Sequence, residues 1–281
     1  MKQLIIAPEL AELELSHLRE LFAQRSGLAF EGQPPAALAD HIRDYMEESH
    51  IFSGCELLRT LRASRSEYEK LLGHLLACES RFFRHSGAFR ALVENVLPEV
   101  RQRKFCTDPR NLRIWSAGCA SGEEAYSIAI ATTEALELSD DWTVNILATD
   151  ISSRALQHAE RGVYPQAALD ALVPRQVEMY FARIGDQLLV KPALRKMVTF
   201  TCANLVECAP AGRFDCIFCL DVLPCLHPDR RNQVVEHFCA SLEPGGYLVL
   251  AADRAATIPA ALELVTEQDA LIYRKPAAAA R

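Results

Sequence analysis

The stretch that decides the fold is Arg113-Ile-Trp-Ser-Ala-Gly-Cys-Ala-Ser-Gly-Glu-Glu124. Its first half is apolar and ends at Gly118, which is typical of a buried strand that runs into a tight turn. From Glu123 to Leu136 the sequence favours a helix. A strand, a glycine loop and a helix in this order predict the first unit of a parallel α/β sheet.

The same alternation continues toward the C-terminus. Apolar runs at 143–150, 214–223 and 247–253 predict further strands, and the stretches 152–161 and 229–242 predict helices between them. This pattern predicts a doubly wound, Rossmann-like sheet. The stretch 163–203 interrupts it, because Ile184-Gly-Asp-Gln187 lies between two short strand-like runs and predicts a hairpin. We expect a small antiparallel β subdomain inserted at about 163–203.

The first hundred residues have a different pattern. Leucines recur there at helical spacing, and Gly27 is a stop signal for the first helix. We expect a small all-α domain over 1–88, a linking helix and linker over 89–110, and the α/β domain over 111–281. Beyond the first helix, predicted helices cover 36–45, 55–76 and 89–100, the last ending near Pro98.

Composition and charge exclude several classes of protein. Half of the residues are hydrophobic and 24% are charged, as in a globular protein. The net charge is -7, whereas a protein that binds nucleic acid usually shows a basic patch. No apolar run is long enough for membrane insertion. Most of the ten cysteines lie in apolar runs, so we expect reduced thiols and a cytoplasmic location. Cys216 and Cys219 should point to opposite faces of a strand, which argues against a metal site.

The glycine loop and the acids after it indicate the kind of ligand. The loop lacks the spacing of a dinucleotide fingerprint, and Glu123 and Glu124 would repel a pyrophosphate at the helix start. S-adenosylmethionine has no phosphate and carries positive charges, so the acids favour this cofactor over NAD or ATP. The alternative is that both acids only complement the helix dipole.

Further polar residues follow the other predicted strands, at the edge where ligands bind in such sheets. Asp150 is placed to accept hydrogen bonds from ribose hydroxyls, although a helix cap is the alternative and Ser152 competes for that role. Asn204, next to Leu205, is placed to hold an adenine edge, or it is only a turn residue. Asp221 ends the fourth strand.

Several motifs in this order resemble the chemoreceptor glutamate methyltransferases of the CheR type over nearly the whole chain. They are SRFFRHSGAF (80–89), RIWSAGCASGEEAYSIAI (113–130), ILATDIS (146–152), ANL (203–205), RFDCIFC (213–219) and LEPGGYLVL (242–250). The resemblance implies S-adenosylmethionine as cofactor and methyl transfer to the side-chain carboxylate of a glutamate. It implies that the acceptor is a chemoreceptor or a related signalling protein.

The resemblance also assigns residues. Arg84 is the expected catalytic residue and reaches the cofactor's carboxylate, which a planar guanidinium matches; a solvated helix-end charge is the alternative. The cofactor-binding residues that it implies are Ser80, Arg84, Ala117, Gly118, Glu123, Asp150, Asn204, Leu205 and Asp221.

The chain departs from the family where the acceptor is held. Leu220, Asp221 and Cys225 stand where the family has Arg, Asn and Tyr, and Pro224 is unusual in that loop. Cys78 and Ser80 stand in place of an Asn-x-Thr pattern. The loop 220–226 is therefore the feature that distinguishes three interpretations: an active methyltransferase of this type, a non-catalytic cofactor-binding scaffold, and an enzyme with another acceptor.

Two surfaces are candidates for docking a protein partner. Arg59, Arg62 and Arg65 share one face of the predicted helix over 55–76 and could meet an acidic receptor, or they are only a solvated face. The inserted hairpin offers an edge for a peptide by strand addition.

Overall fold

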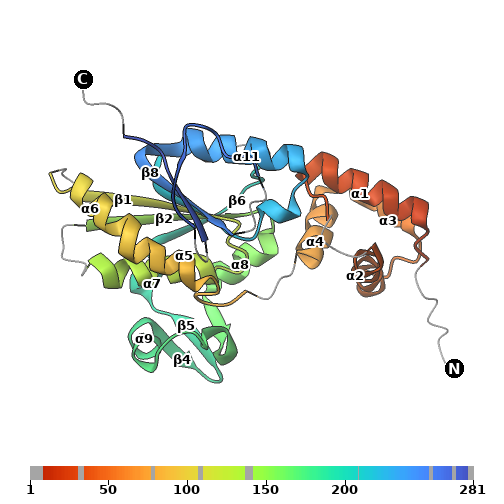
Figure 1. Ribbon diagram of the computed structural model, residues 1–281. Helices are drawn as coiled ribbons and strands as arrows, with labels where there is room; N and C mark the ends of the chain where they lie inside the picture. Colours follow the sequence, from red (N-terminus) through yellow and green to blue (C-terminus); the bar gives the residue numbers. More distant parts are fainter. Residues whose placement is uncertain are drawn as a thin grey trace.

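A sheet of seven strands forms the centre of the molecule (Figure 1). The computed structural model describes residues 9–30, 35–76, 80–106, 110–136, 142–207, 209–252, 256–267 and 270–277. The five strands β6, β2, β1, β7 and β8 run parallel in that spatial order, and β10 pairs antiparallel with β8 and β9. The strands are β1 (Arg110–Ala117), β2 (Trp142–Asp150), β6 (Val198–Cys202), β7 (Phe214–Cys219), β8 (Leu242–Ala251), β9 (Glu263–Glu267) and β10 (Ala270–Arg274). The predicted doubly wound sheet is confirmed, and the antiparallel pair at its edge was not predicted.

Helices cover both faces of this sheet. Figure 1 shows α7 (Glu123–Leu136) and α11 (Pro228–Ser241) on opposite sides, and α8 (Ser153–Arg161) follows β2. Buried side chains divide accordingly into two clusters, because successive residues of a strand point to opposite faces. Cys216 belongs to one cluster and Cys219 to the other, which confirms the predicted orientation of this pair.

The four N-terminal helices of the described ranges share one of the two cores of the sheet. Side chains of these helices pack in the same buried cluster as Trp115 and Phe238. The first helix ends at Gly27, which has φ 72° and caps it as predicted. The predicted helix over 55–76 is instead two helices, because Ser64 leaves the helical conformation and its hydroxyl caps the next one. The four helices are α1 (Glu12–Ser26), α2 (Pro35–Glu48), α3 (Gly54–Ala63) and α4 (Arg65–Leu75).

The linking helix is longer and less regular than predicted. It passes from α5 (Ser86–Ala91) through a π-helical turn, η1 (Leu92–Val96), into α6 (Leu97–Arg103). Pro98 does not end it; it is the second residue of α6, directly after the π-helical turn.

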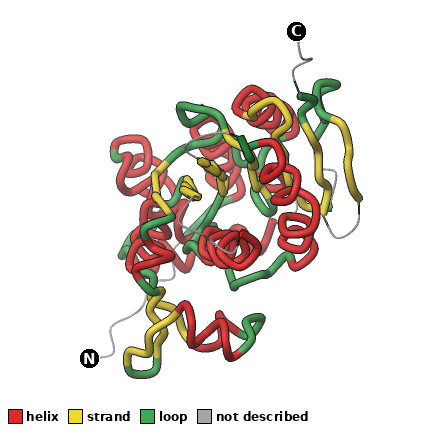
Figure 2. The backbone as a smooth tube through the Cα atoms, turned by 90° about the vertical axis from the view of Figure 1, so that its left-hand side faces the viewer, coloured by secondary structure: helices red, strands yellow, loops and turns green. Residues whose placement is uncertain are grey.

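A second, three-stranded antiparallel sheet protrudes beside α7 (Figures 1 and 2). The predicted hairpin is its β4–β5 turn, with Gly185 at φ 57°. The last strand of the small sheet, β5, ends at Val190, and the next strand, β6, belongs to the central sheet. The small sheet is therefore shorter than the predicted insertion over 163–203. Its elements are β3 (Val163–Pro165), η2 (Gln166–Leu169), α9 (Pro174–Tyr180), β4 (Phe181–Ile184), β5 (Gln187–Val190) and, after it, α10 (Pro192–Arg195).

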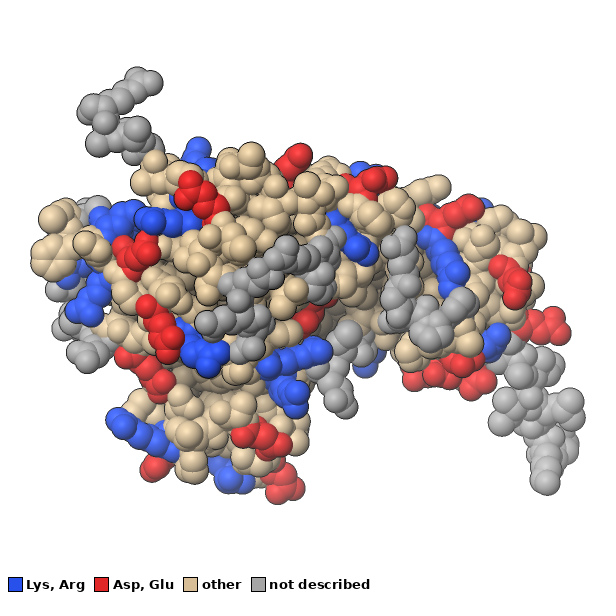
Figure 3. Space-filling model, viewed as in Figure 1, with Lys and Arg blue, Asp and Glu red and all other residues tan. Residues whose placement is uncertain are grey.

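The molecular surface mixes charges of both signs. On the face drawn in Figure 3, acidic and basic side chains intermingle over the helical and the α/β regions. No helix within the described ranges is long and apolar enough to cross a membrane.

A buried carboxylate fastens the linking helix to the central sheet. Asp215 on β7 is 1% exposed and accepts hydrogen bonds from Arg103 (2.7 Å) and Lys104 (2.6 Å) of the linking segment. It also accepts one from the backbone N–H of Arg113 on β1 (2.9 Å). The segment that leads from the pocket to the first strand is thereby fixed at its far end.

Replacing Asp215 with Ala should destabilise the protein by about 3 kcal/mol, because two cations and a backbone N–H lose their buried partner. Urea denaturation followed by circular dichroism measures this loss. Asp40→Ala is the matched control, since it removes an exposed ion pair with Arg43 and should cost less than about 1 kcal/mol. Equal losses in the two variants would contradict the structural role of Asp215.

Candidate cofactor site

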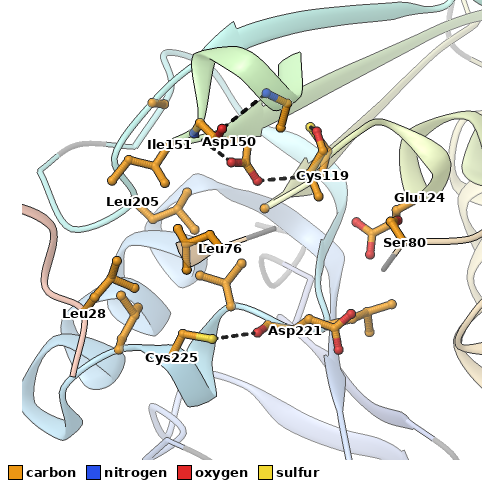
Figure 4. Close-up of a pocket in the computed structure, with 18 of the residues that line it drawn as sticks. Leu28, Leu76, Ser80, Cys119, Glu124, Asp150, Ile151, Leu205, Asp221 and Cys225 are labelled. Atoms are coloured by element: carbon orange, nitrogen blue, oxygen red, sulfur yellow. Dashed lines mark hydrogen bonds between the residues drawn. The ribbon is translucent and has the colours of Figure 1, made fainter. Parts of the chain in front are cut away.

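A pocket opens at the carboxyl ends of β1, β2 and β7 (Figure 4). One wall comes from the helical region, through Leu28 and Leu76, and another from the segment 80–89. The loops after the central strands form the remaining walls. The pocket therefore lies where the predicted site residues were expected to gather.

The glycine loop reaches the pocket in a conformation that needs glycine. Gly118 has φ 89°, and a Cβ atom added there would lie 1.9 Å from Cγ2 of Val222. The N–H groups of Gly118 and Cys119 both donate to the carbonyl of Thr149, at 2.7 and 3.0 Å. These bonds hold the start of the loop against the end of the neighbouring strand β2. Ala117, which was also predicted, is buried behind the loop and does not line the pocket.

Asp150 lies in the pocket with both carboxylate oxygens oriented by backbone groups. Oδ2 accepts the N–H of Ala120 (2.9 Å) and Oδ1 that of Ser152 (2.8 Å). Burial raises the pKa of this carboxyl, although those bonds counteract the shift. Ser152 caps α8 through the N–H of Ala155 (3.2 Å), which confirms that Asp150 is not the cap. Each carboxylate oxygen has lone pairs left for a ligand hydroxyl.

The two acids at the start of α7 have different surroundings. Glu123 is 4% exposed, accepts the hydroxyl of Ser121 (2.7 Å) and does not line the pocket. Glu124 does line it and accepts the hydroxyl of Ser116 (2.6 Å). Burial raises the pKa of Glu124 to about 7. The sequence resemblance assigned Glu123, whereas the acid that faces the pocket is Glu124.

The segment 80–89 is anchored by its two phenylalanines. Phe82 is fully buried, with ring centroids 5.1 Å from Tyr164 and 5.3 Å from Phe181 of the small sheet. Phe83 has φ 52°, and its N–H donates to the hydroxyl of Ser127 on α7 (3.0 Å). This fixed turn places the side chains of Arg84 and His85 at the pocket. Ser80 and Arg81 of the same segment also line it. Cys78 lies outside the described residues.

A carboxylate from the loop after β7 pairs with both cations. Asp221 accepts His85 Nε2 at 2.9 and 3.0 Å, and Arg84 Nη1 lies 3.4 Å from Asp221 Oδ2. Partial burial alone would raise the pKa of Asp221, but the His85 hydrogen bond and the two positive charges lower it below its usual value. The same hydrogen bond raises the pKa of His85. Arg84 is thus held at the pocket rather than being only a solvated charge, and His85 was not predicted from the sequence.

The loops after β6 and β7 close the pocket against the helical region. Asn204 lines it, but its side chain also forms a turn, accepting the N–H of Val206 (3.1 Å) and donating to the carbonyl of Arg25 (3.1 Å). Its neighbour Leu205 is buried and lines the pocket. The N–H of Ala29 donates to the carbonyl of Cys225 (2.9 Å), so the helical region fixes the loop 220–226.

Replacing Glu124 with Gln should stabilise the protein at pH 8. The unfolded chain ionises this group near 4.5 and the folded protein near 7, so folding takes up a proton in this window and stability falls as pH rises through it. Glutamine carries no charge, and we expect a gain of about 2 kcal/mol at pH 8 and little difference below pH 4.5. Urea denaturation at both pH values measures the gain. A variant no more stable than the wild type at pH 8 would contradict the buried state of Glu124.

Comparison with known proteins places this site in a family. Residues 78–270 match the family described as "CheR methyltransferase, SAM binding domain". A "Chemotaxis protein methyltransferase 1" of Pseudomonas aeruginosa is 30% identical over 94% of this chain and 97% of its own length. A "Chemotaxis protein methyltransferase" of Vibrio parahaemolyticus is 34% identical over 78% of this chain and 81% of its own.

A further relative and a solved structure complete the comparison. The "Chemotaxis protein methyltransferase" of Vibrio anguillarum is 36% identical over 70% of this chain and 72% of its own length. The crystal structure of magnesium protoporphyrin IX methyltransferase from Synechocystis aligns with a TM-score of 0.38 and 15% identity over 95% and 98% of the two chains, which is too distant to support an argument. The family match covers more than half of the chain and includes every loop that lines the pocket except the helical wall. This chain therefore belongs to the CheR methyltransferase family and is an S-adenosylmethionine-dependent methyltransferase.

Proposed function

We propose that this protein transfers the methyl group of S-adenosylmethionine to the side-chain carboxylate of a glutamate in a chemoreceptor or related signalling protein. One observation carries the proposal: the carboxylates of Asp150 and Glu124 line the same pocket as the cationic groups of Arg84 and His85. Asp150 and Glu124 suit a cofactor that brings a sulfonium and an ammonium. Arg84 and His85 suit an arriving carboxylate. The names of the curated relatives point to the same pathway.

The residues present fit this cofactor. The Asp150 carboxylate is oriented by two backbone N–H groups and can still accept hydrogen bonds from ribose hydroxyls. Gly118 lets the loop approach a ligand closely, because no Cβ intervenes. The residues of the proposed cofactor-binding set that line the pocket are Ser80, Arg84, Gly118, Asp150, Asn204, Leu205 and Asp221, to which the geometry adds Glu124. Ala117 and Glu123, which the resemblance also implies, do not line it.

The chemistry asks little of the protein beyond positioning. The bound cofactor supplies an electrophilic methyl group on a sulfonium. A glutamate side chain has an unperturbed pKa of about 4.3, so it arrives ionised and needs no general base. The protein has to strip water from the carboxylate and aim it at the methyl. Leu28, Leu76 and Leu220 give the pocket apolar walls for that purpose.

Docking of the acceptor protein is part of the proposal. Arg59 and Arg62 are exposed on α3, but Arg65 begins α4 and pairs with Glu69 (2.8 Å), so the predicted three-residue face is divided. The outer strand β4 of the small sheet offers an edge for strand addition.

A cytoplasmic location is supported by the cysteines, since those in the described ranges are free thiols.

Replacing Gly118 with Ala should abolish or strongly weaken binding of S-adenosylhomocysteine, by about 10-fold or more, because the new methyl group clashes with Val222 and displaces the loop. Calorimetry at 25 °C measures the affinity. Gly185→Ala is the matched control, since Gly185 also has positive φ but has no neighbour within 4 Å of an added Cβ. That variant should lose about 1 kcal/mol of stability and keep its affinity. Equal affinities for both variants would show that the loop does not contact the ligand.

Incubating the purified chain with tritiated S-adenosylmethionine and the cytoplasmic fragment of a chemoreceptor from the same organism should label the receptor. The label should be released as methanol by mild base, because a carboxyl methyl ester hydrolyses there. Asp150→Ala is the inactive control and should lower labelling about 10-fold or more through weaker cofactor binding. Label that resists base would contradict a carboxylate acceptor, and cofactor binding without any labelling would favour a non-catalytic scaffold.

A further inference from the structure

The pocket is lined by an ion pair whose histidine the sequence resemblance did not assign. His85 and Asp221 are 136 positions apart in the chain, and the histidine Nε2 lies within hydrogen-bond distance of both carboxylate oxygens, at 2.9 and 3.0 Å. Both residues line the pocket, and their side chains are 26% and 49% exposed. A solvent-accessible histidine is therefore locked in orientation beside the cofactor site.

The loop after β7 has few groups that could hold an acceptor carboxylate. Among its side chains from Leu220 to Leu226 the only hydrogen-bond donor is the thiol of Cys225, a weak one. That thiol lies 3.6 Å from the carbonyl of Asp221. The cationic side chains that line the pocket and can hold a carboxylate come from the segment 80–89; they are Arg81, Arg84 and His85.

The histidine of this pair has one ring nitrogen that Asp221 does not use. Asp221 is one carboxylate shared by His85 and Arg84. The second ring nitrogen of His85, Nδ1, has no hydrogen-bond partner among the residues that the structure describes. In an imidazolium both ring nitrogens are donors, so Nδ1 can donate to an incoming anion while Nε2 stays on Asp221.

We propose that His85, oriented by Asp221, binds the acceptor carboxylate and determines specificity for it. This inference rests on the proposed function, because it concerns the acceptor of that reaction. Asp221, which also lines the cofactor pocket, then positions the histidine. The acceptor donors that the loop 220–226 lacks are supplied from the other side of the pocket.

The protonation state of the histidine supports this role. The groups that face His85 are Asp221 from the loop after β7, Arg84 beside it and Glu124 from α7. The hydrogen bond to Asp221 and the two carboxylate charges raise the pKa of His85, against the effects of burial and of Arg84. The ring is charged below its raised pKa, so acceptor binding should weaken as the pH rises through that value.

Three variants test the proposal by their effect on the acceptor KM. His85→Gln should raise the KM for the receptor fragment, measured with tritiated S-adenosylmethionine, about 10-fold or more at pH 7, by loss of a charged hydrogen bond. Its affinity for S-adenosylhomocysteine in calorimetry should stay unchanged, which also shows that the variant is folded. His85→Arg keeps a cation throughout the pH range, so it should retain a low KM at alkaline pH, where the wild type loses it.

The third variant tests the pairing. Asp221→Asn removes the charge that raises the pKa of His85, so the alkaline loss of acceptor binding should move to lower pH. Because Glu124 also titrates in this pocket, each variant is compared with the wild type at the same pH.

Several outcomes would overturn the proposal. An unchanged acceptor KM in His85→Gln would do so, as would an equal loss of affinity for S-adenosylhomocysteine, which would place His85 in the cofactor site. A wild-type rate that rises with pH, with the rise absent in His85→Gln, would make the histidine a base instead. If His85→Gln forms the base-labile ester as well as the wild type does, only this inference is contradicted. If the wild type forms no such ester, the proposed function is contradicted as well.

Discussion

The backbone carbonyl of Thr149 is the group on which the rest of the site depends. It accepts the N–H groups of both Gly118 and Cys119, and the Thr149 hydroxyl accepts the indole N–H of Trp115 (2.8 Å). Thr149 is fully buried, so no water can replace these partners. The end of the second strand is thereby joined to the glycine loop of the first. Asp150, the next residue, is consequently presented to the pocket at a fixed distance from that loop.

The helical region packs directly against the central sheet. Its side chains share a buried cluster with one face of the sheet, and backbone bonds link residues 27–29 to the loop 225–227. Asn204 extends the same connection through the carbonyl of Arg25. A movement of the helices on binding a protein partner would therefore reach the pocket wall directly.

Local patterns predicted the sheet and the edge that carries the site, because strand periodicity and the glycine loop are short-range signals. The break at Ser64 was missed because the leucine spacing of α3 continues into α4 and the hydroxyl cap is visible only in the structure. Glu123 and Glu124 are adjacent, and sequence alone does not show which of them turns toward the pocket. The pairing of His85 with Asp221 joins segments 136 positions apart, so no local pattern contains it. Asn204 lies at the predicted edge, and its bond to the N–H of Val206 is the turn role that the sequence left open as the alternative. Its bond to the carbonyl of Arg25 joins distant segments and was not foreseen.

The central claim is that the loop 118–122 and Asp150 form a binding site for S-adenosylmethionine. Titration calorimetry of the full chain with S-adenosylhomocysteine tests it most directly, because this product lacks the transferable methyl group and no turnover can intervene. The account predicts a saturable heat with one ligand per chain. The absence of heat at high micromolar ligand, with the protein folded, would contradict it.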